Sequence, residues 1–126
     1  MESQNQFQIQ LEHGMGYNGL TKNSLILHPN LVDYIYIAGG VIVIAEMNDP
    51  NKQKLLRCHD DVVTCISLSH NGELLASGQK GKNSDIFVWD YKTGNVIYNI
   101  KVKILSYKWN LLFTRWLFQP KVFIIF

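Results

Sequence analysis

Apolar and polar residues alternate with a period of two along most of residues 1–100, and no stretch of a dozen residues there has helical periodicity. Because alternate side chains of a strand point to opposite faces, this pattern predicts an all-β protein. A first strand is expected at residues 7–11, where Phe7, Ile9 and Leu11 alternate with polar residues. Eight further short strands are predicted at residues 25–27, 34–38, 41–45, 54–56, 63–68, 74–77, 86–89 and 96–100.

Turn-forming residues separate the predicted strands. Gly39-Gly40 and Thr93-Gly94 each lie between two apolar runs. Asn71-Gly72 is the residue pair that favours a two-residue hairpin, so we expect such a turn between residues 63–68 and 74–77.

The predicted strands form two groups of four that repeat along the chain. Leu27 to Asn30 aligns with Leu68 to Asn71 at an offset of 41 residues, and Ile44 to Glu46 aligns with Val88 to Asp90 at an offset of 44. Four-stranded units that repeat about every 40–45 residues are typical of β-propeller blades. The sequence therefore predicts a partial propeller, with a first blade at about residues 24–57 and a second at about residues 59–100.

Charge is distributed unevenly along the 126 residues. Residues 1–100 carry seven basic and ten acidic side chains, a net charge of −3, whereas residues 101–126 carry five basic side chains and no acidic one. The acidic part would repel phosphate, so nucleic acid is not an expected partner. No apolar run is long enough for a membrane span, and the N-terminal residues do not resemble a secretory signal, so we expect a cytoplasmic protein without a membrane partner.

Residues 59–90 resemble a WD40 repeat. Cys58-His59 stands where the family has Gly-His, Ala76-Ser77-Gly78 ends a strand, and Trp89-Asp90 closes the repeat. Repeats of this family are typically held by a buried hydrogen-bond chain that runs from Trp through Ser and His to an acidic residue. The resemblance implies a structural network of this kind formed by His59, Ser77, Asn83, Asp85 and Trp89. Asn83 stands where the acid is usual, and an amide there would weaken the charge-assisted end of the chain.

The sequence gives little support for a metal site, a catalytic site or a nucleotide-binding loop. Cys58, His59, Cys65 and His70 match no usual zinc spacing and would be scattered by strand alternation, so no metal is expected. No residue has the setting of a catalytic nucleophile, and the glycines form neither GxGxxG nor GxxxxGK. We therefore expect no enzyme activity and no cofactor.

A narrower resemblance appears when the first half of the chain is included. Residues 7–100 are similar to the amino-terminal end of the cilia- and flagella-associated protein 52 family, and more distantly to echinoderm microtubule-associated protein-like WD repeats. The matching positions are Gly16, Tyr17, Asn18, Gly19, His28, Pro29, Trp89 and Asp90. The resemblance implies a non-enzymatic structural WD40 protein of the cytoskeleton, in the axoneme of cilia or flagella. The implied partners are the tubulin of doublet microtubules and neighbouring inner proteins.

The resemblance ends near Ile100. Residues 101–126 are rich in basic and aromatic side chains and have no glycine, which differs from a further blade. They are interpreted as an aberrant tail read from an intron or a shifted frame. The alternatives are a basic aromatic element that binds nucleic acid or a membrane surface, and an amphipathic partner helix. Since a closed propeller needs at least about four blades, we expect an incomplete ring.

This interpretation has one consequence for the isolated chain, and two rival functions stand beside it. A truncated chain would associate through exposed blade edges and through apolar faces that carry Val63, Cys65, Ile66 and Leu68. The rivals are a cytoplasmic microtubule-associated WD40 protein of the echinoderm type and a generic WD40 adaptor that recognises a peptide.

Overall fold

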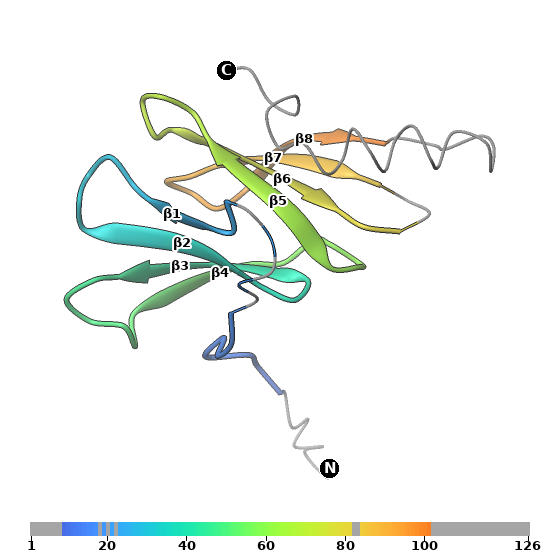
Figure 1. Ribbon diagram of the computed structural model, residues 1–126. Helices are drawn as coiled ribbons and strands as arrows, with labels where there is room; N and C mark the ends of the chain where they lie inside the picture. The colour runs from blue at the N-terminus through green and yellow to red at the C-terminus, as the bar shows by residue number, and fades with distance from the viewer. Residues whose placement is uncertain (1–8, 18, 20, 22, 82–83, 102–126) are drawn as a thin grey trace, which may run out of the picture.

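Two four-stranded sheets make up the computed structural model, which describes residues 9–17, 19, 21, 23–81 and 84–101 (Figure 1). The described residues include no helix, which confirms the all-β prediction. The first sheet contains β1 (Leu25–Leu27), β2 (Asp33–Ala38), β3 (Val41–Glu46) and β4 (Gln53–Leu56). The second contains β5 (Val63–Leu68), β6 (Leu74–Gln79), β7 (Ile86–Asp90) and β8 (Val96–Ile100).

Each strand pairs antiparallel with its neighbours in sequence, so both sheets are simple meanders in the orders β1-β2-β3-β4 and β5-β6-β7-β8. Short connections enforce this topology, since antiparallel neighbours can be joined by very few residues. Ala38 pairs with Val41, for example, and Gly39 between them has a φ of 63°. Glycine adopts this left-handed conformation without the steric cost that a side chain would add.

The predicted two-residue hairpin at Asn71-Gly72 is wrong. Five residues, 69–73, connect β5 to β6. The Ser69 N–H donates to the Leu74 carbonyl at 2.8 Å, and the Ser69 hydroxyl accepts from the Leu74 N–H at 2.9 Å. These bonds close a wider turn, in which the Asn71 side chain also bonds to Ser69.

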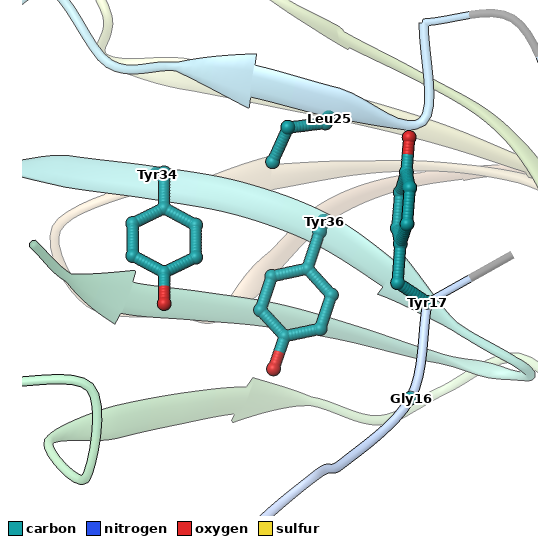
Figure 2. A pocket seen from close by; sticks show the side chains of 5 residues that line it. All are labelled: Gly16, Tyr17, Leu25, Tyr34 and Tyr36. Atoms are coloured by element: carbon teal, nitrogen blue, oxygen red, sulfur yellow. The ribbon is translucent and has the colours of Figure 1, made fainter. Parts of the chain in front are cut away.

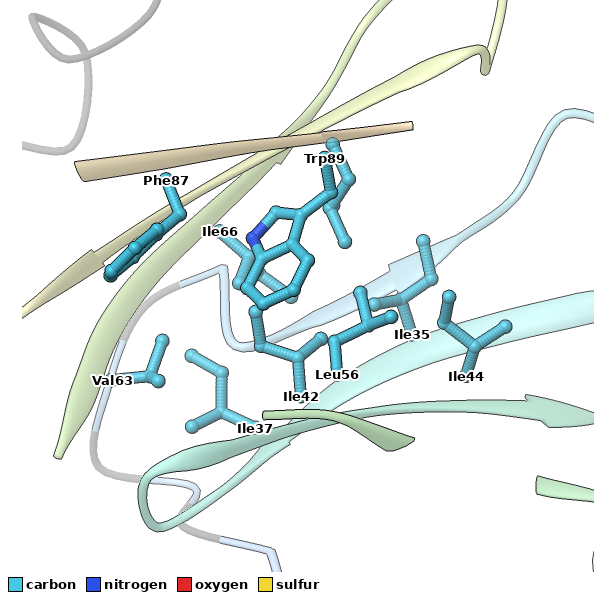
Figure 3. Packing of buried hydrophobic residues seen from close by; sticks show 10 residues of the cluster. Ile35, Ile37, Ile42, Ile44, Leu56, Val63, Ile66, Phe87 and Trp89 are labelled. Atoms are coloured by element: carbon cyan, nitrogen blue, oxygen red, sulfur yellow. The ribbon is translucent and has the colours of Figure 1, made fainter. Parts of the chain in front are cut away.

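An apolar core lies between the two sheets (Figure 3). We call the face of each sheet that lines this core its inner face and the opposite one its outer face. The first sheet contributes Ile35, Ile37, Ile42, Ile44 and Leu56, and the second contributes Val63, Ile66, Leu75, Phe87 and Trp89. Val63 and Ile66 are therefore buried, contrary to the expectation of an exposed face, because the first sheet covers them.

The predicted strand at residues 7–11 does not form where the structure describes it. Phe7 and Gln8 lie outside the described residues, and residues 9–11 are in no strand. Ile9 is 98 % exposed, so its side chain is not buried against either sheet. At the other end, Lys101 is in no strand and residues 102–126 lie outside the described part.

Residues 13–17, which we call the N-terminal segment, cross the outer face of the first sheet. The Gly14 N–H donates to Gln53 Oε1 at 2.9 Å, and the Tyr36 hydroxyl donates to the Gly14 carbonyl at 2.9 Å. His13 is within 2.8 Å of the Asn51 carbonyl. These contacts fix the segment over β3 and β4, and the Tyr17 hydroxyl lies 3.0 Å from Ser24 Oγ, next to the start of β1.

Candidate functional site

A chain of side-chain hydrogen bonds runs through the second sheet, with Ser77 at its centre. Trp89 Nε1–H donates to Ser77 Oγ at 2.8 Å, and His59 Nε2 lies 2.7 Å from the same oxygen. Strand register explains the placement, because Ser77 pairs with Phe87 and Leu75 pairs with Trp89 on the inner face. Ser77 is fully buried and Trp89 is 2 % exposed, so both polar groups depend on these bonds.

The chain continues from His59 to a carboxylate through Gln79. His59 Nδ1 lies 2.7 Å from Gln79 Oε1, and Gln79 Nε2–H donates to Asp60. A carboxylate only accepts hydrogen bonds, so the Gln79 amide must direct its NH₂ group to Asp60 and its oxygen to His59. We call the set Asp60, Gln79, His59, Ser77 and Trp89 the His59 network.

These directions fix the tautomer of His59. Because Gln79 Oε1 can only accept, Nδ1 carries the proton, and the unprotonated Nε2 accepts from the Ser77 hydroxyl. Burial lowers the pKa of His59 below its ordinary value of 6.5. The Gln79 hydrogen bond and the charges of Asp60 and Asp85 act in the opposite direction and are outweighed. His59 is therefore neutral near pH 7, as the bonding pattern requires.

The structure brings together three of the five residues predicted for this network, namely His59, Ser77 and Trp89. Asn83 lies outside the described residues. Asp85 is not a hydrogen-bond partner of His59, because Gln79 and Ser77 occupy both ring nitrogens. The Asp85 backbone carbonyl instead accepts from the Gln79 N–H at 3.3 Å.

Sequence reasoning missed Gln79 and Asp60. The sequence could have identified Gln79, because it lies two residues after Ser77 and strand alternation places it on the same face as Ser77. Asp60 is adjacent to His59 in the sequence. Ser77 is fully buried and its hydroxyl is engaged at both ends, which suits it to holding strands together rather than to nucleophilic attack.

A second polar cluster joins the two sheets at the loops after β1 and β5. His28 Nδ1 accepts from the Asn30 N–H at 3.1 Å, so Nε2 carries the proton and donates to the Gly72 carbonyl at 3.0 Å. The His28 ring also stacks on Tyr91 with centroids 4.1 Å apart. The Tyr91 hydroxyl donates to Asp33 at 2.9 Å. We call His28, Asp33, Gly72 and Tyr91 the inter-sheet cluster.

Two features of the inter-sheet cluster depend on its close packing. Gly72 has a φ of 76°, and a Cβ atom there would lie 2.7 Å from His28 Nε2, so glycine is required on both counts. Burial, together with the hydrogen bond to Asp33 and its charge, raises the pKa of Tyr91 and keeps its hydroxyl protonated as a donor. Pro29 lies next to His28 in the same loop, where it also approaches Gly72.

The remaining motif residues lie at two other places. Gly16 and Tyr17 line a shallow hollow of about 340 Å³ on the outer face of the first sheet, together with Leu25, Tyr34 and Tyr36 (Figure 2). Asn18 is outside the described residues, and Gly19 lies beside the Tyr17 ring.

Asp90 shapes the turn that follows β7. Its side chain accepts from the Thr93 N–H at 2.9 Å, and this bond lowers the pKa of Asp90. The Asp90 backbone carbonyl accepts from the Gly94 N–H at 2.8 Å. Asp90 therefore stabilises the turn and makes no hydrogen bond to the His59 network among the described residues.

The residues considered for zinc do not assemble into a site. Among the described residues, no group of three or more His, Cys, Asp or Glu side chains could hold a metal ion. Burial raises the pKa of the Cys65 thiol, and Cys58 is exposed; both cysteines are free. In the same part of the chain, no helix is long and apolar enough to cross a membrane.

Comparison with known proteins gives matches of three kinds. The family model described as WD domain, G-beta repeat matches residues 50–90. Cilia- and flagella-associated protein 52 of Chlamydomonas reinhardtii is 38 % identical over 71 % of this chain, and that of Mus musculus is 33 % identical over 75 %. A solved structure of U3-55K superposes with a TM-score of 0.58 at 19 % identity, over 72 % of this chain and 29 % of that one.

The two meandering sheets and the matched repeat define a WD40-repeat protein with β-propeller blades. The chain belongs to the cilia- and flagella-associated protein 52 family. It spans 16 % of the length of the Chlamydomonas and mouse relatives. The structural likeness to U3-55K, at 19 % identity, concerns the fold alone.

The matched repeat is staggered relative to the sheets. Residues 50–90 include β4 of the first sheet and β5 to β7 of the second. The matched repeat therefore supplies the last strand of one blade and the first three strands of the next. The two blades are joined both by the chain connection and by packing in the shared core.

Proposed function

We propose that this chain is a non-enzymatic structural unit of ciliary or flagellar doublet microtubules, acting as part of a WD40 microtubule inner protein. The observation that carries the proposal is the similarity to relatives named for cilia and flagella, at 38 % identity in Chlamydomonas reinhardtii and 32 % in Homo sapiens. Its location would be the cytoskeleton of the axoneme. Its partners would be tubulin and neighbouring inner proteins.

The geometry of the polar clusters supports a structural role. The donors and acceptors of the His59 network bond to one another around the second sheet. Those of the inter-sheet cluster form hydrogen bonds that join the two sheets. Fully satisfied polar networks of this kind rigidify a fold. A rigid blade pair offers a fixed surface for shape-matched contacts with other proteins, which is what a scaffold inside a microtubule requires.

Fractionation of axonemes tests the proposal. The tagged full chain is expressed in a ciliated or flagellated cell, the axonemes are stripped with detergent and salt, and the chain is measured in the doublet fraction. We expect most of it to stay with the doublets. A fully soluble cytoplasmic pool would overturn the proposal.

A matched variant separates specific binding from aggregation. Trp89→Ala removes a core side chain and the donor to Ser77, so the second blade should not fold. We expect this variant to be lost from the doublet fraction. If it stays there as well as the wild type does, the signal reflects precipitation. Binding along single microtubules in cells without cilia would instead support the rival cytoplasmic role.

A further inference from the structure

The loop that joins β5 to β6 contains Asn71-Gly72, one of two Asn-Gly pairs in the sequence; the other is Asn18-Gly19. An asparagine that precedes glycine is prone to deamidation, because the next backbone nitrogen can attack its side-chain carbonyl carbon and glycine has no side chain to hinder the attack. Asn71 is exposed, so water has access to its amide. The pair is therefore a candidate site of chemical modification.

Folding engages both reacting groups of this pair in hydrogen bonds. The Gly72 N–H, whose nitrogen would attack, donates to the Ser69 carbonyl at 2.9 Å. Asn71 Oδ1 accepts from the Ser69 hydroxyl at 2.7 Å and from the Glu73 N–H at 3.2 Å. Asn71 Nδ2 donates to the Glu73 carboxylate at 2.7 Å. Attack requires the Gly72 nitrogen to lose its proton and the side chain to rotate, so these bonds must open first.

The internal repeat provides an equivalent loop in the first sheet, with a different residue after the asparagine. Leu31 aligns with Gly72 at the offset of 41, and its N–H donates to the His28 carbonyl at 3.0 Å. Asn30 Oδ1 accepts from two backbone N–H groups, each at 3.0 Å. Leu31 is also left-handed, with a φ of 59° against 76° at Gly72. A loop of this kind therefore accepts leucine, and its backbone alone does not demand glycine.

Packing between the sheets is what requires glycine at residue 72. A Cβ atom there would lie 2.7 Å from His28 Nε2, which donates to the Gly72 carbonyl at 3.0 Å. Gly72 is buried, whereas Leu31 is 72 % exposed and has room for its side chain. The contact that joins the sheets thus places the least hindering residue directly after an asparagine.

We propose that Asn71 is a deamidation site that the folded loop keeps closed, and that its conversion breaks the inter-sheet cluster. When the loop opens, the Gly72 nitrogen bonds to Asn71 Cγ, the bond from Cγ to Nδ2 breaks, and Nδ2 leaves as ammonia with the proton of the Gly72 nitrogen. The cyclic imide then takes up a water molecule. Opening at Cγ gives aspartate, and opening at the main-chain carbonyl gives isoaspartate. This inference does not depend on the proposed ciliary role.

Either product disrupts bonds that the amide makes. A carboxylate only accepts hydrogen bonds, so the donor to Glu73 is lost and two negative charges come to lie side by side. Isoaspartate also adds a carbon to the main chain, which displaces the Gly72 carbonyl from His28. The His28 ring stacks on Tyr91 of the second sheet, with centroids 4.1 Å apart. Conversion therefore weakens the junction between the sheets, and refolding does not reverse it.

Incubation of the full 126-residue chain at mildly alkaline pH tests the chemistry. Peptide mapping by mass spectrometry and isoaspartate-specific methylation are the readouts. In urea, Asn71 and Asn18 should convert at similar rates, since both then lie in unfolded chain. In native buffer, Asn71 should convert at least about tenfold more slowly than in urea. Asn30, which precedes leucine, should keep its amide under both conditions.

Two loop variants test whether the hydrogen bonds close the site. Ser69→Ala removes the donor to Asn71 Oδ1 and the acceptor of the Leu74 N–H, and Glu73→Ala, at an exposed position, removes the acceptor of Asn71 Nδ2. Each should speed conversion of Asn71 in native buffer by at least about threefold and leave the rate in urea unchanged. Circular dichroism checks that each variant is folded in native buffer.

Ser84→Ala is the matched control for these variants, because it removes an exposed hydroxyl that bonds to the Gly81 carbonyl in another loop. It should leave both rates unchanged. If Ser69→Ala and Glu73→Ala, while folded, convert no faster than Ser84→Ala, the loop bonds do not protect Asn71 and the inference is wrong.

The effect on the inter-sheet cluster is measured on chain that has been converted in urea and returned to native buffer. It should unfold at a lower urea concentration than unconverted chain. Asn71→Gln is the control, because glutamine does not form the cyclic imide readily, so the same incubation should leave its unfolding midpoint unchanged. In a His28→Ala background the shift should be smaller, because the contact that conversion breaks is already absent.

Three further results would overturn the inference. Equal conversion of Asn71 in native buffer and in urea would mean that the folded loop does not close the site. Conversion of Asn18 but not of Asn71 in urea would mean that Asn71-Gly72 is not a reactive pair. An unchanged unfolding midpoint after conversion of Asn71 would mean that the inter-sheet cluster does not depend on its amide.

Discussion

Ser77 is the residue on which the His59 network depends, because one hydroxyl serves both Trp89 and His59. We expect Ser77→Ala to destabilise the chain by about 2–4 kcal/mol, since it leaves the buried Trp89 N–H and the half-buried His59 ring nitrogen without this partner. Urea unfolding followed by circular dichroism measures this.

Ser84→Ala is the matched control, because its hydroxyl donates to the Gly81 carbonyl at 3.0 Å at an exposed position. It should cost less than about 0.5 kcal/mol. Equal costs for the two substitutions would contradict the assigned importance of Ser77.

His59 makes stability depend on pH at the residue scale. Its pKa is lower in the folded state than the ordinary value of 6.5, so the unfolded chain binds more protons between these two values. The stabilisation is fully present above pH 6.5 and is lost as the pH falls towards the lowered pKa, with a slope of at most about 1.4 kcal/mol per pH unit. Urea unfolding at a series of pH values, from about pH 7.5 down to the pH at which the chain no longer folds, measures this loss of stability.

His59→Gln supplies the comparison, because glutamine does not titrate and can both donate and accept. We expect the difference in stability between wild type and His59→Gln to shrink as the pH is lowered. A constant difference would mean that the pKa of His59 is not lowered by folding.

At the scale of the elements, the loops after β1 and β5 hold the two sheets together. Gly72→Ala should be costly, because its φ of 76° disfavours a side chain and the new Cβ would displace His28. Gly39→Ala is the control, since Gly39 has a φ of 63° but nothing within 4 Å of its Cβ position. Gly39→Ala should cost about 1–2 kcal/mol from backbone strain, and Gly72→Ala at least about 1 kcal/mol more. Thermal unfolding measures the loss of stability in the two variants. Equal losses would mean that the contact between residue 72 and His28 does not matter for stability.

The elements themselves follow closely from local patterns. Leu25–Leu27, Val63–Leu68 and Val96–Ile100 form strands with the predicted bounds, because alternation and turn residues act over a few positions. The turn at Asn71-Gly72 differs from its prediction because Ser69 and Asn71 bond to each other and to the backbone around it. Those side-chain bonds compete with the local preference for a two-residue turn.

At the scale of the whole molecule, the shared core should make the two sheets unfold together. Ile42 is fully buried in the first sheet and packs in the cluster that includes Trp89 of the second. Ile42→Ala should cost about 2–5 kcal/mol through lost burial and a cavity. Hydrogen exchange should show reduced protection of β6 and β7 as well as of β2 and β3.

Ile9→Ala is the control for this coupling, since Ile9 is 98 % exposed and its truncation should leave exchange unchanged. If Ile42→Ala lowers protection in the first sheet alone, the sheets fold independently and the core does not unite them.

The sequence by itself determined the eight strands of the two four-stranded units and the family. It also marked His59, Ser77 and Trp89, because a repeat motif records residues that meet at fixed register positions. Only the tertiary structure decided which acceptor His59 uses, since Gln79, which lies 20 residues away, and not Asp85 is the hydrogen-bond partner of Nδ1. It also decided that Val63 and Ile66 are buried and that residues 9–11 stay unpaired. Periodicity is a local property, whereas hydrogen-bond partners and burial depend on which distant segments the fold brings together.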